Sequence, residues 1–352
     1  AYNRPMLTKS IVAGLGAEQI AIEGPEWYEE NKVYQMLGKQ VQSIDMKEKE
    51  VLLDNGEKVH FTKLIYALGS ECFIPPIEGS SLPEVVAIRR LSDVEKVEKL
   101  METSSNAVVI GGGVLGLEAA WELKKAGLTV QVLEVAPVLM GRQLDAGSAE
   151  ILKQTAKKSG VAIHTGVSVA AIEGDEHVTG VRLADGTVIP AELVIVSAGV
   201  RANTALAQEI GLDIGRAVKV SPKMETSVPG IYACGDCAEY DGANYAIWPE
   251  AVEQGRIAGA NAAGEELEYE PVAAALTFHG MNTALFAAGD NGKNPGLLYK
   301  TVEYRDMGKG RYRKYYFLNN RLSGVILMGD LSEMAKMTEA LAKHAPYKEV
   351  IG

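Results

Sequence analysis

The sequence predicts an α/β protein with two three-layer domains of related fold, followed by a C-terminal α+β domain. Three observations lead to this prediction. An apolar run at residues 107–110 ends in a glycine-rich turn, after which a helix and a second strand are expected. Segments of residues 41–69 recur within residues 169–199. From residue 271 the pattern changes to short strands and one closing helix.

The glycine-rich turn has the spacing Gly111-x-Gly113-x-x-Gly116, and a helix is expected over residues 114–126. Gly111 allows a tight turn, Gly113 lets the backbone approach a pyrophosphate, and Gly116 lets the helix pack closely on the strand. The next strand ends at Glu134, 18 residues after Gly116, where an acid binds a ribose 2′-hydroxyl. The pattern is typical of a Rossmann-like dinucleotide site.

An ordinary glycine-rich turn is the alternative interpretation, and the helix and distal acid in register argue against it. Val114 and Leu115, at the helix start, are expected to face the phosphates. Glu134 would repel a 2′-phosphate, and Val135 rather than an arginine follows it. NADH is therefore favoured over NADPH.

Composition excludes several classes of protein. The chain has 352 residues, 47% of them hydrophobic and 23% charged, which is ordinary for a globular protein. A net charge of −11 argues against binding to nucleic acid or to an anionic membrane surface. No apolar run reaches membrane-spanning length, and no signal peptide opens the chain. Three cysteines in so long a chain favour a reducing compartment, so a cytoplasmic location is expected.

The N-terminal part contains the first copy of an internal repeat. Residues 1–30 are expected to be loop-like, with a short helix around residues 17–22, and strands and a hairpin follow. Three matched pairs of segments make up the repeat: 41–45 and 169–173, 51–56 and 181–186, 64–69 and 194–199. The offset is 128 residues at Val41 and Val169, and 130 at Gly69 and Gly199.

The repeat also predicts a second dinucleotide site. The second copy begins with the glycine-rich strand–turn–helix, and the first copy has none. Subtracting the offset would place a first glycine turn about 20 residues before Ala1. We therefore expect the chain to lack the opening βαβ unit of its first domain. Two related domains imply two dinucleotides, one of them NADH and the other a bound cofactor such as FAD.

A second turn in the later part of the chain carries an acid. A strand expected at residues 231–233 leads to Gly235 and Asp236, and an acid there can accept hydrogen bonds from a ribityl hydroxyl. Trp248 opens a helix that is expected to run to residue 263, and core packing is an equally good interpretation of this tryptophan.

The final segment is expected to be an antiparallel sheet closed by a helix over residues 332–344. The predicted domain organisation has four segments. They are a first part of the FAD-binding domain at 1–88, an NAD-binding domain at 89–210, a second part of the FAD-binding domain at 211–268, and a C-terminal α+β domain at 269–352.

Together these landmarks resemble the pyridine nucleotide–disulfide oxidoreductase superfamily, whose members carry two dinucleotide-binding domains. The opening Tyr2-Asn3-Arg4-Pro5-Met6-Leu7-Thr8-Lys9 is similar to the Y-x-R-P-x-L-S-K segment of rubredoxin and ferredoxin reductases, shared by the flavin portion of the nitrite reductase large subunit. The resemblance implies that Lys9 lies beside the flavin N5, paired with Glu118 as the catalytic pair, and that Arg4 lies on the FAD phosphates.

The expected cofactor contacts follow from the turns and the resemblance. The FAD residues would be Arg4, Lys9, Val41, Ala67, Leu68, Gly69, Gly235, Asp236 and Trp248. The NAD residues would be Gly111, Gly113, Val114, Leu115, Gly116, Glu118, Glu134, Ala198 and Gly199. No metal site is expected, because five scattered histidines and three cysteines do not supply the ligands at suitable spacing.

The cysteine positions favour one branch of the superfamily. Thiol-based members need a cysteine pair or a single cysteine near the flavin, and no cysteine precedes Cys72. The resemblance therefore implies a reductase that takes a hydride from NADH and passes electrons to a redox protein: a rubredoxin, a ferredoxin or a nitrite-reductase-like partner domain. The alternatives are an NADH oxidase or peroxidase, and a truncated, non-catalytic NADH-binding or interaction module. A homodimer is left open.

Two further features have both a functional and a structural interpretation. Cys234 and Cys237 form a CxxC, which could be a redox disulfide, although two small residues flanking the Gly235–Asp236 turn are the favoured interpretation. A basic tract could steer an acidic carrier, although a solvated hairpin edge is favoured. The tract consists of Lys309, Arg311, Arg313, Lys314 and Arg321.

Overall fold

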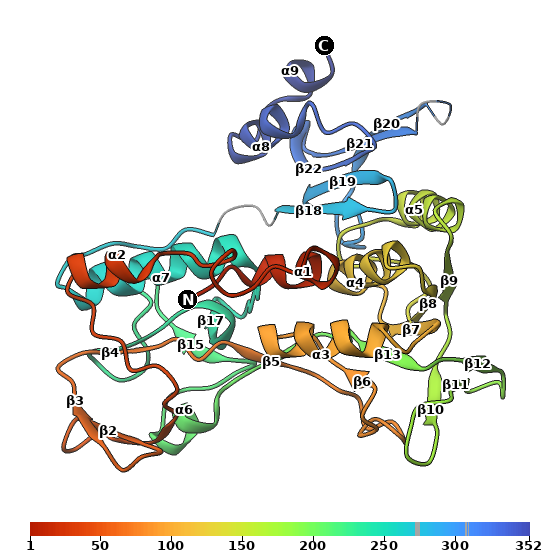
Figure 1. Ribbon diagram of the computed structural model, residues 1–352. Helices are drawn as coiled ribbons and strands as arrows, with labels where there is room; N and C mark the ends of the chain where they lie inside the picture. Colours follow the sequence, from red (N-terminus) through yellow and green to blue (C-terminus); the bar gives the residue numbers. More distant parts are fainter. Residues whose placement is uncertain (272–274, 307, 309) are drawn as a thin grey trace. The chain divides into compact units, whose positions relative to one another are not determined.

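The computed structural model describes residues 1–271, 275–306, 308 and 310–352 (Figure 1). The chain divides into two compact units, each built from separate stretches of sequence. The first unit holds residues 1–2, 21–73 and 199–272, and the second holds residues 3–20, 74–198 and 273–352. The boundaries of the four segments expected from the sequence differ from those of these two units, and the four-segment organisation stays a prediction.

The first unit consists of short strand pairs around a small core. Its antiparallel three-stranded sheet contains β1 (Val41–Asp45), β2 (Glu50–Leu53) and β3 (Lys58–His60). Its other strand pairs are β4 (Leu64–Tyr66) with β16 (Ile231–Ala233), β5 (Ser70–Cys72) with β14 (Val200–Ala202), and β15 (Val218–Val220) with β17 (Ala238–Tyr240). Its helical elements are α2 (Pro25–Glu30), α6 (Ala205–Glu209), the 3₁₀ turn η2 (Gly235–Cys237) and α7 (Trp248–Ala262). Tyr66, Ala233 and Cys237 lie in the buried core.

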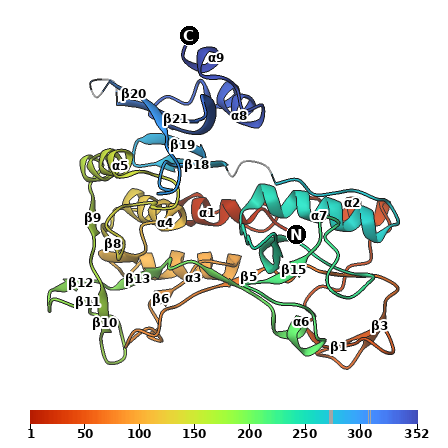
Figure 2. The same cartoon turned by 180° about the vertical axis from the view of Figure 1, so that it is seen from behind.

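The second unit is built on a five-stranded parallel sheet in the order β6-β13-β7-β8-β9. The strands are β6 (Val85–Val86), β7 (Asn106–Ile110), β8 (Thr129–Glu134), β9 (Val161–Thr165) and β13 (Leu193–Val196). Its helices are η1 (Arg4–Met6), α1 (Leu7–Ala13), α3 (Leu91–Met101), α4 (Val114–Lys125) and α5 (Ala146–Lys158). Helix α1 packs beside α4, as Figures 1 and 2 both show. A separate sheet contains β10 (Val169–Glu173), β11 (Gly180–Leu183) and β12 (Val188–Pro190).

The C-terminal part of the second unit is an antiparallel sheet in the order β18-β19-β22-β21-β20. Its elements are β18 (Ala275–Gly280), β19 (Thr283–Gly289), β20 (Lys300–Asp306), β21 (Arg311–Leu318), β22 (Arg321–Met328), α8 (Met334–Ala342) and α9 (Tyr347–Ile351). Phe317, Leu322 and Leu327 form its core with Met337 and Leu341 of α8. The turn Asn319–Asn320 joins β21 to β22 with both residues left-handed, as expected for asparagine.

The internal repeat is confirmed by the strand register. In the first copy, the pairing of β1 with β2 shifts by one residue between Val41 and Ser43. In the second copy, the pairing of β10 with β11 shifts at the matching place, between Val169 and Ala171. The offset changes from 128 to 130 because the connection between the two strands is longer in the second copy: four residues separate the paired Asp45 and Glu50, and six separate the paired Glu173 and Gly180.

The hairpin turns repeat as well. Gly56 and Gly186 have φ values of +82° and +88°, which favour glycine. The side chains of Asn55 and Asp185 each accept a hydrogen bond from the backbone N–H two residues later. The matching strands β4 and β13 differ in their neighbours. In the second copy, β13 lies between β6 and β7, whereas in the first copy, within the described residues, β4 pairs with β16.

The expected helix around residues 17–22 is wrong. The structure instead places α1 at Leu7–Ala13 and α2 at Pro25–Glu30. Pro5 lies at the start of η1, which leads directly into α1, and Gly14 ends α1 in a left-handed conformation at φ +61°. Other boundaries agree closely: the strand expected to end at Glu134 is β8, and the strand expected at residues 231–233 is β16.

Candidate cofactor sites

The glycine-rich turn joins β7 to α4 with the geometry that the spacing predicts. Gly111 has a φ of +119°, and a Cβ there would lie 2.2 Å from the carbonyl oxygen of Ser197. A Cβ on Gly116 would lie 2.1 Å from the carbonyl oxygen of Gly111. Both positions therefore exclude a side chain, the first for backbone conformation and the second for close helix–strand packing.

Gly113 differs from its two partners. A Cβ built on it would meet nothing within 4 Å, so the chain leaves open space in front of this residue. Gly113 is also the N-cap of α4, whose first backbone N–H groups have no partner within the helix. Open space in front of a row of donors fits a pyrophosphate, and Val114 and Leu115 supply the first two positions of that row.

Glu134 is held next to the turn by the backbone. One carboxylate oxygen accepts a 2.6 Å hydrogen bond from the Gly112 N–H, and the other accepts a 2.7 Å bond from the Ala136 N–H. Each oxygen keeps a lone pair, so the carboxylate can still accept from ribose hydroxyls. Val135, the next residue, is 70% exposed and places no positive charge there. The arrangement fits NADH and opposes a 2′-phosphate.

Glu118 is buried on α4, one turn after the glycines. It is 8% exposed, and Oε2 accepts a 2.8 Å hydrogen bond from the hydroxyl of Thr8 on α1. Burial raises the pKa of Glu118, and the Thr8 hydrogen bond and the charge of Lys9 oppose this shift only in part. Lys9 therefore acts on Glu118 through its charge. The direct hydrogen bond to Glu118, which the expected pairing would assign to Lys9, is made by Thr8 instead.

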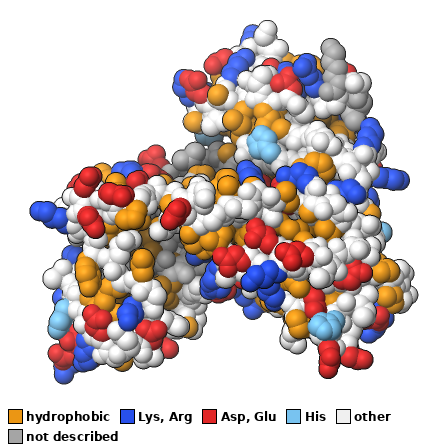
Figure 3. Space-filling view, viewed as in Figure 1, with side chains coloured by type: hydrophobic (Ala, Val, Ile, Leu, Met, Phe, Trp, Pro, Cys, Tyr) orange, Lys and Arg blue, Asp and Glu red, His pale blue; other side chains and the backbone are white. Residues whose placement is uncertain are grey.

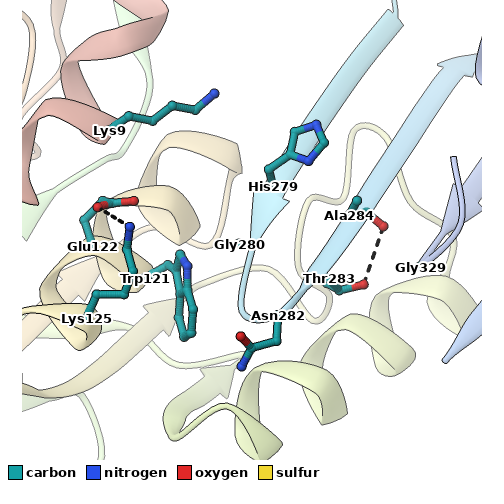
Figure 4. Close-up of a pocket in the computed structure, with 10 residues that line it drawn as sticks. All are labelled: Lys9, Trp121, Glu122, Lys125, His279, Gly280, Asn282, Thr283, Ala284 and Gly329. Carbon is teal, nitrogen blue, oxygen red and sulfur yellow. Dashed lines mark hydrogen bonds and ion pairs between the residues drawn. The ribbon is translucent and has the colours of Figure 1, made fainter. Parts of the chain in front are cut away.

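Lys9 borders a cleft of about 580 Å³ within the second unit. The side chain extends from α1 toward β18, where His279 stands opposite (Figure 4). On α4, Lys125 forms a 2.7 Å ion pair with the buried Glu122. Arg4 lies on the neighbouring turn η1 and is exposed.

The first unit holds the remaining residues expected to contact FAD. Asp236 lies in η2, directly after β16, and its carboxylate accepts a 2.8 Å hydrogen bond from the hydroxyl of Ser70. Gly235, with φ +73°, donates its N–H to the side-chain oxygen of Gln254 at 2.9 Å. The side chain of Asn244 donates to the carbonyl oxygens of Asp236 and Ala238, at 2.9 and 2.8 Å. This clamped turn with an acid at its tip fits a polyhydroxyl chain such as the ribityl group of FAD.

Other expected contacts lie on nearby parts of the same unit. Val41 begins β1, Ala67 and Leu68 are exposed after β4, and Gly69 has φ +65°. Trp248 is half-buried at the start of α7. Among the residues expected to contact NAD, Ala198 is exposed and is the last residue of the 74–198 stretch of the second unit, and Gly199, with φ +96°, begins the next stretch of the first unit.

The CxxC does not have the properties of a redox pair. Cys234 and Cys237 are buried free thiols, and the Cys237 thiol donates to the carbonyl oxygens of Tyr66 and Cys234, both at 3.3 Å. Burial raises the pKa of Cys234 to about 12, which disfavours the reactive thiolate. The structural interpretation of these cysteines is favoured by both observations.

The basic tract is largely neutralised within the chain. Arg313 forms ion pairs with Asp330 and Glu333, at 3.2 and 2.7 Å. Lys314 pairs with Asp145, and Arg311 lies 3.5 Å from Asp330. Arg321 donates to the carbonyl oxygen of His344 at 3.1 Å. Lys309 lies outside the described residues, and acidic and basic side chains are interspersed over the face in Figure 3.

Sequence reasoning missed Thr8, Gln254 and Asn244. Thr8 stands next to the predicted lysine, so its place in the motif was the available signal. Asn244 and Gln254 act through contacts 6 to 19 residues away, on a loop and a helix, and no local pattern marks them. In the part of the chain that the structure describes, no cluster of His, Cys, Asp or Glu could hold a metal, and no helix is long and apolar enough to cross a membrane.

The second unit has a parallel sheet with a glycine-rich turn and an acid fixed beside that turn, and the first unit has a separate clamped acidic turn. These features are typical of a dinucleotide-binding oxidoreductase. The sequence matches the family described as pyridine nucleotide-disulphide oxidoreductase over residues 1–255, and the chain belongs to that family. Residues 275–345 match the rubredoxin NAD+ reductase C-terminal domain. Proteins of this family are NAD(P)H-dependent oxidoreductases that use FAD and NAD(H), which confirms the expected family, fold class and cofactors.

Individual proteins to which the chain is similar are NAD(P)H-dependent oxidoreductases. The chain is 34% identical to a Bacillus subtilis nitrite reductase (NAD(P)H) over 349 residues, covering 99% of this chain and 43% of that protein. It is 27% identical to an NADH-rubredoxin oxidoreductase of Clostridium acetobutylicum, covering 97% of this chain and 85% of that protein.

Among solved structures, the covalent putidaredoxin reductase–putidaredoxin complex is similar, with a TM-score of 0.88, 26% identity, and coverage of 98% of this chain and 85% of that one. The chain spans less than half the length of the curated nitrite reductases that it matches.

Proposed function

We propose that the chain takes a hydride from NADH through FAD and passes electrons to a redox protein acceptor: a rubredoxin, a ferredoxin or a partner domain of a nitrite-reductase-like assembly. The arrangement of Thr8, Lys9 and Glu118 on the α1–α4 pair is the observation that carries the proposal. It puts a buried carboxylate about one helix turn past the open glycine turn, with a lysine close enough for its charge to act on that carboxylate.

The second unit would bind NADH. The α4 N-terminus and Gly113 would hold the pyrophosphate, Glu134 would accept from the adenosine ribose, and Glu118 would lie beside the nicotinamide end. Support for this orientation comes from the 2.6 Å bond that fixes Glu134 against the turn and from the space in front of Gly113.

Several residues would together bind FAD and orient its flavin ring. Asp236 would accept from a ribityl hydroxyl, Arg4 would lie on a phosphate, and Lys9 would donate to the flavin N5 edge. FAD, when bound, supplies the ability to take up two electrons together and to release them singly. Lys9 and Glu118 would set the local charge in a site from which water is partly excluded.

The two alternatives make different predictions. An NADH oxidase or peroxidase of the thiol type would need a cysteine beside the flavin. Cys72 is the first cysteine of the chain, and Cys234 and Cys237 are buried free thiols. A non-catalytic module would bind NADH through α4 without retaining flavin. A homodimer stays a prediction, and the three free cysteines support a reducing, cytoplasmic location.

Anaerobic stopped-flow spectroscopy tests the proposal. The purified protein, supplied with FAD, is mixed with NADH, and flavin absorbance is followed before and after an oxidised rubredoxin is added. We expect NADH to bleach the flavin and rubredoxin to restore it, with NADPH at least about tenfold less effective. A protein that binds NADH but holds no flavin would support the non-catalytic module, and rapid peroxide turnover would support the oxidase alternative.

A further inference from the structure

The Lys9–His279 cleft joins three elements of the second unit. Lys9 comes from α1, Trp121, Glu122 and Lys125 come from α4, and His279 and Asn282 come from the β18–β19 hairpin. Figure 4 shows these side chains around one opening, with Lys9 and His279 on opposite sides. The α4 residues lie one to two turns beyond Glu118, on the part of the helix away from the glycine turn.

The charge in this cleft is unlike that of the chain as a whole. The protein has a net charge of −11, whereas two ammonium groups and an imidazole here face one carboxylate, that of Glu122. Lys125 is paired with Glu122, but within the described residues no hydrogen bond or ion pair joins the Lys9 ammonium to another side chain. The half-buried Lys9 therefore presents an ammonium group with several N–H donors, so that one can serve the predicted flavin contact while another pairs with an incoming anion.

The hairpin wall of the cleft is fixed in place. Met281 and Asn282 form a tight turn with φ values of +53° and +56°, and Met281 is fully buried although it lies at the tip. The Met281 carbonyl oxygen accepts a 2.7 Å hydrogen bond from the hydroxyl of Ser159, the C-cap residue of α5. A Cβ on Gly280 would lie 2.7 Å from the Phe278 ring, so the wall fits tightly against its neighbours. A preformed wall reduces the entropy lost on binding.

The basic side chains of the C-terminal sheet do not offer an equivalent surface. Arg311, Arg313 and Lys314 are paired with acids of the same unit. The Lys9–His279 cleft, in contrast, offers positive charge beside α1, the helix that carries the predicted flavin contact.

We propose that the Lys9–His279 cleft is where the redox acceptor protein docks, by inserting an acidic side chain between Lys9, Lys125 and His279. This inference rests on the proposed function, which supplies a protein acceptor, and deepens it by naming the surface. The occupant is an acidic iron–sulfur carrier, because the local charge is opposite to such a carrier's and Trp121 adds an apolar contact at the rim.

Charge reversal outside the predicted flavin contacts tests the inference. In the full-length protein, Lys125→Glu and His279→Glu are compared with Lys336→Glu, which makes the same charge change as Lys125→Glu at an exposed lysine of α8. Flavin reduction by NADH is measured by anaerobic stopped flow, and reduction of an acidic rubredoxin is measured across a series of salt concentrations. An uncharged quinone serves as an acceptor that needs no docking.

We expect both cleft variants to raise the KM for rubredoxin about tenfold at low salt and to flatten its salt dependence. Flavin reduction, quinone reduction and the kcat at saturating rubredoxin should stay within about twofold of the unaltered protein, as should all properties of Lys336→Glu.

Equal KM values in all three variants, or an equal rise in all three, would overturn the cleft as docking surface while leaving the proposed function intact. Failure of NADH to reduce the flavin of the unaltered protein would instead overturn the proposed function, and the docking inference with it.

Discussion

The hydroxyl of Thr8 donates a 2.8 Å hydrogen bond to Oε2 of Glu118, joining α1 to α4 across 110 residues of sequence. Both residues are buried, at 4% and 8% exposure. A buried carboxylate is stabilised in its charged form by each donor that it keeps. Thr8 is therefore a positioning residue: it holds the acid that the proposed function places beside the nicotinamide, and leaves Lys9 free to extend into the cleft.

Replacing Thr8 by valine should raise the pKa of Glu118 further. The pKa of this acid is already raised in the folded protein, so its contribution to stability is present at low pH and is lost as pH rises through the folded-state pKa. Thr8→Val removes a donor to the charged form and should lower the free energy of unfolding by about 1–3 kcal/mol at pH 8, and by less at pH 5. Urea unfolding at both pH values measures this, with Thr8→Ser as a control that keeps the hydroxyl. The same loss at both pH values would show that the bond does not act on the carboxylate.

The glycines of the turn should separate folding from binding. Gly116→Ala places a methyl 2.1 Å from a backbone oxygen and should destabilise the protein by about 3 kcal/mol. Gly113→Ala meets no atom within 4 Å, so its stability should change little, while its NADH affinity falls at least about tenfold because the methyl occupies space in front of the α4 donors. Thermal unfolding and calorimetric titration with NADH distinguish the two. Unchanged NADH binding in a folded Gly113→Ala would place the pyrophosphate elsewhere.

Local patterns made much of this structure predictable. The β7–α4–β8 unit follows from apolar periodicity and glycine spacing, which depend on neighbours in sequence. The repeat was also readable, because the two hairpins share a bulge and a turn glycine. Helix α1 was misplaced, since its seven residues are too few to show a clear period.

The partners of site residues were less predictable. The Lys9–Glu118 proximity came from a resemblance, but the donor to Glu118 is Thr8, a choice made by the packing of α1 on α4. The partners of the basic tract were unpredictable for the same reason. Lys314 forms an ion pair with Asp145, 169 residues away, and no sequence pattern links the two residues.

The clamp on the Asp236 turn should govern flavin affinity. Asn244 is the donor to two carbonyl oxygens of this turn, and Asn244→Ala leaves both without that donor. We expect FAD to bind about tenfold more weakly, while NADH binding by the second unit is unchanged. Fluorescence titration of FAD measures the change. Asn55→Ala, in the exposed β2–β3 turn, is the matched control. Equal FAD affinity in both variants would show that the turn holds its shape without the clamp.

The Asp145–Lys314 pair should make stability depend on acid. Burial opposes ionisation of Asp145, but hydrogen bonds from Lys314 and Ser148 outweigh it and hold the pKa of Asp145 at about 2. A lowered acid pKa adds stability above the unfolded-state value, and this is lost as pH falls from about 4 to about 2. Asp145→Asn should therefore lower the free energy of unfolding by about 2 kcal/mol at pH 7 and by much less near pH 2.5. Glu339→Gln, which removes an exposed helical pair, should change little at either pH. A pH-independent effect of Asp145→Asn would assign its role to helix capping alone.

The buried cysteines should be dispensable for electron transfer. Cys234 and Cys237 are free thiols in the core, and burial raises the pKa of Cys237 as well as that of Cys234. The double variant Cys234→Ala/Cys237→Ala should keep NADH-driven rubredoxin reduction within about twofold, with a modest loss of stability from the small cavities left. In the unaltered protein, a thiol reagent should label at most the half-buried Cys72 until denaturant is added. A loss of activity of a hundredfold or more in a folded double variant would return the CxxC to the reaction, because a single-electron route from the flavin to a carrier has no use for a dithiol in the core.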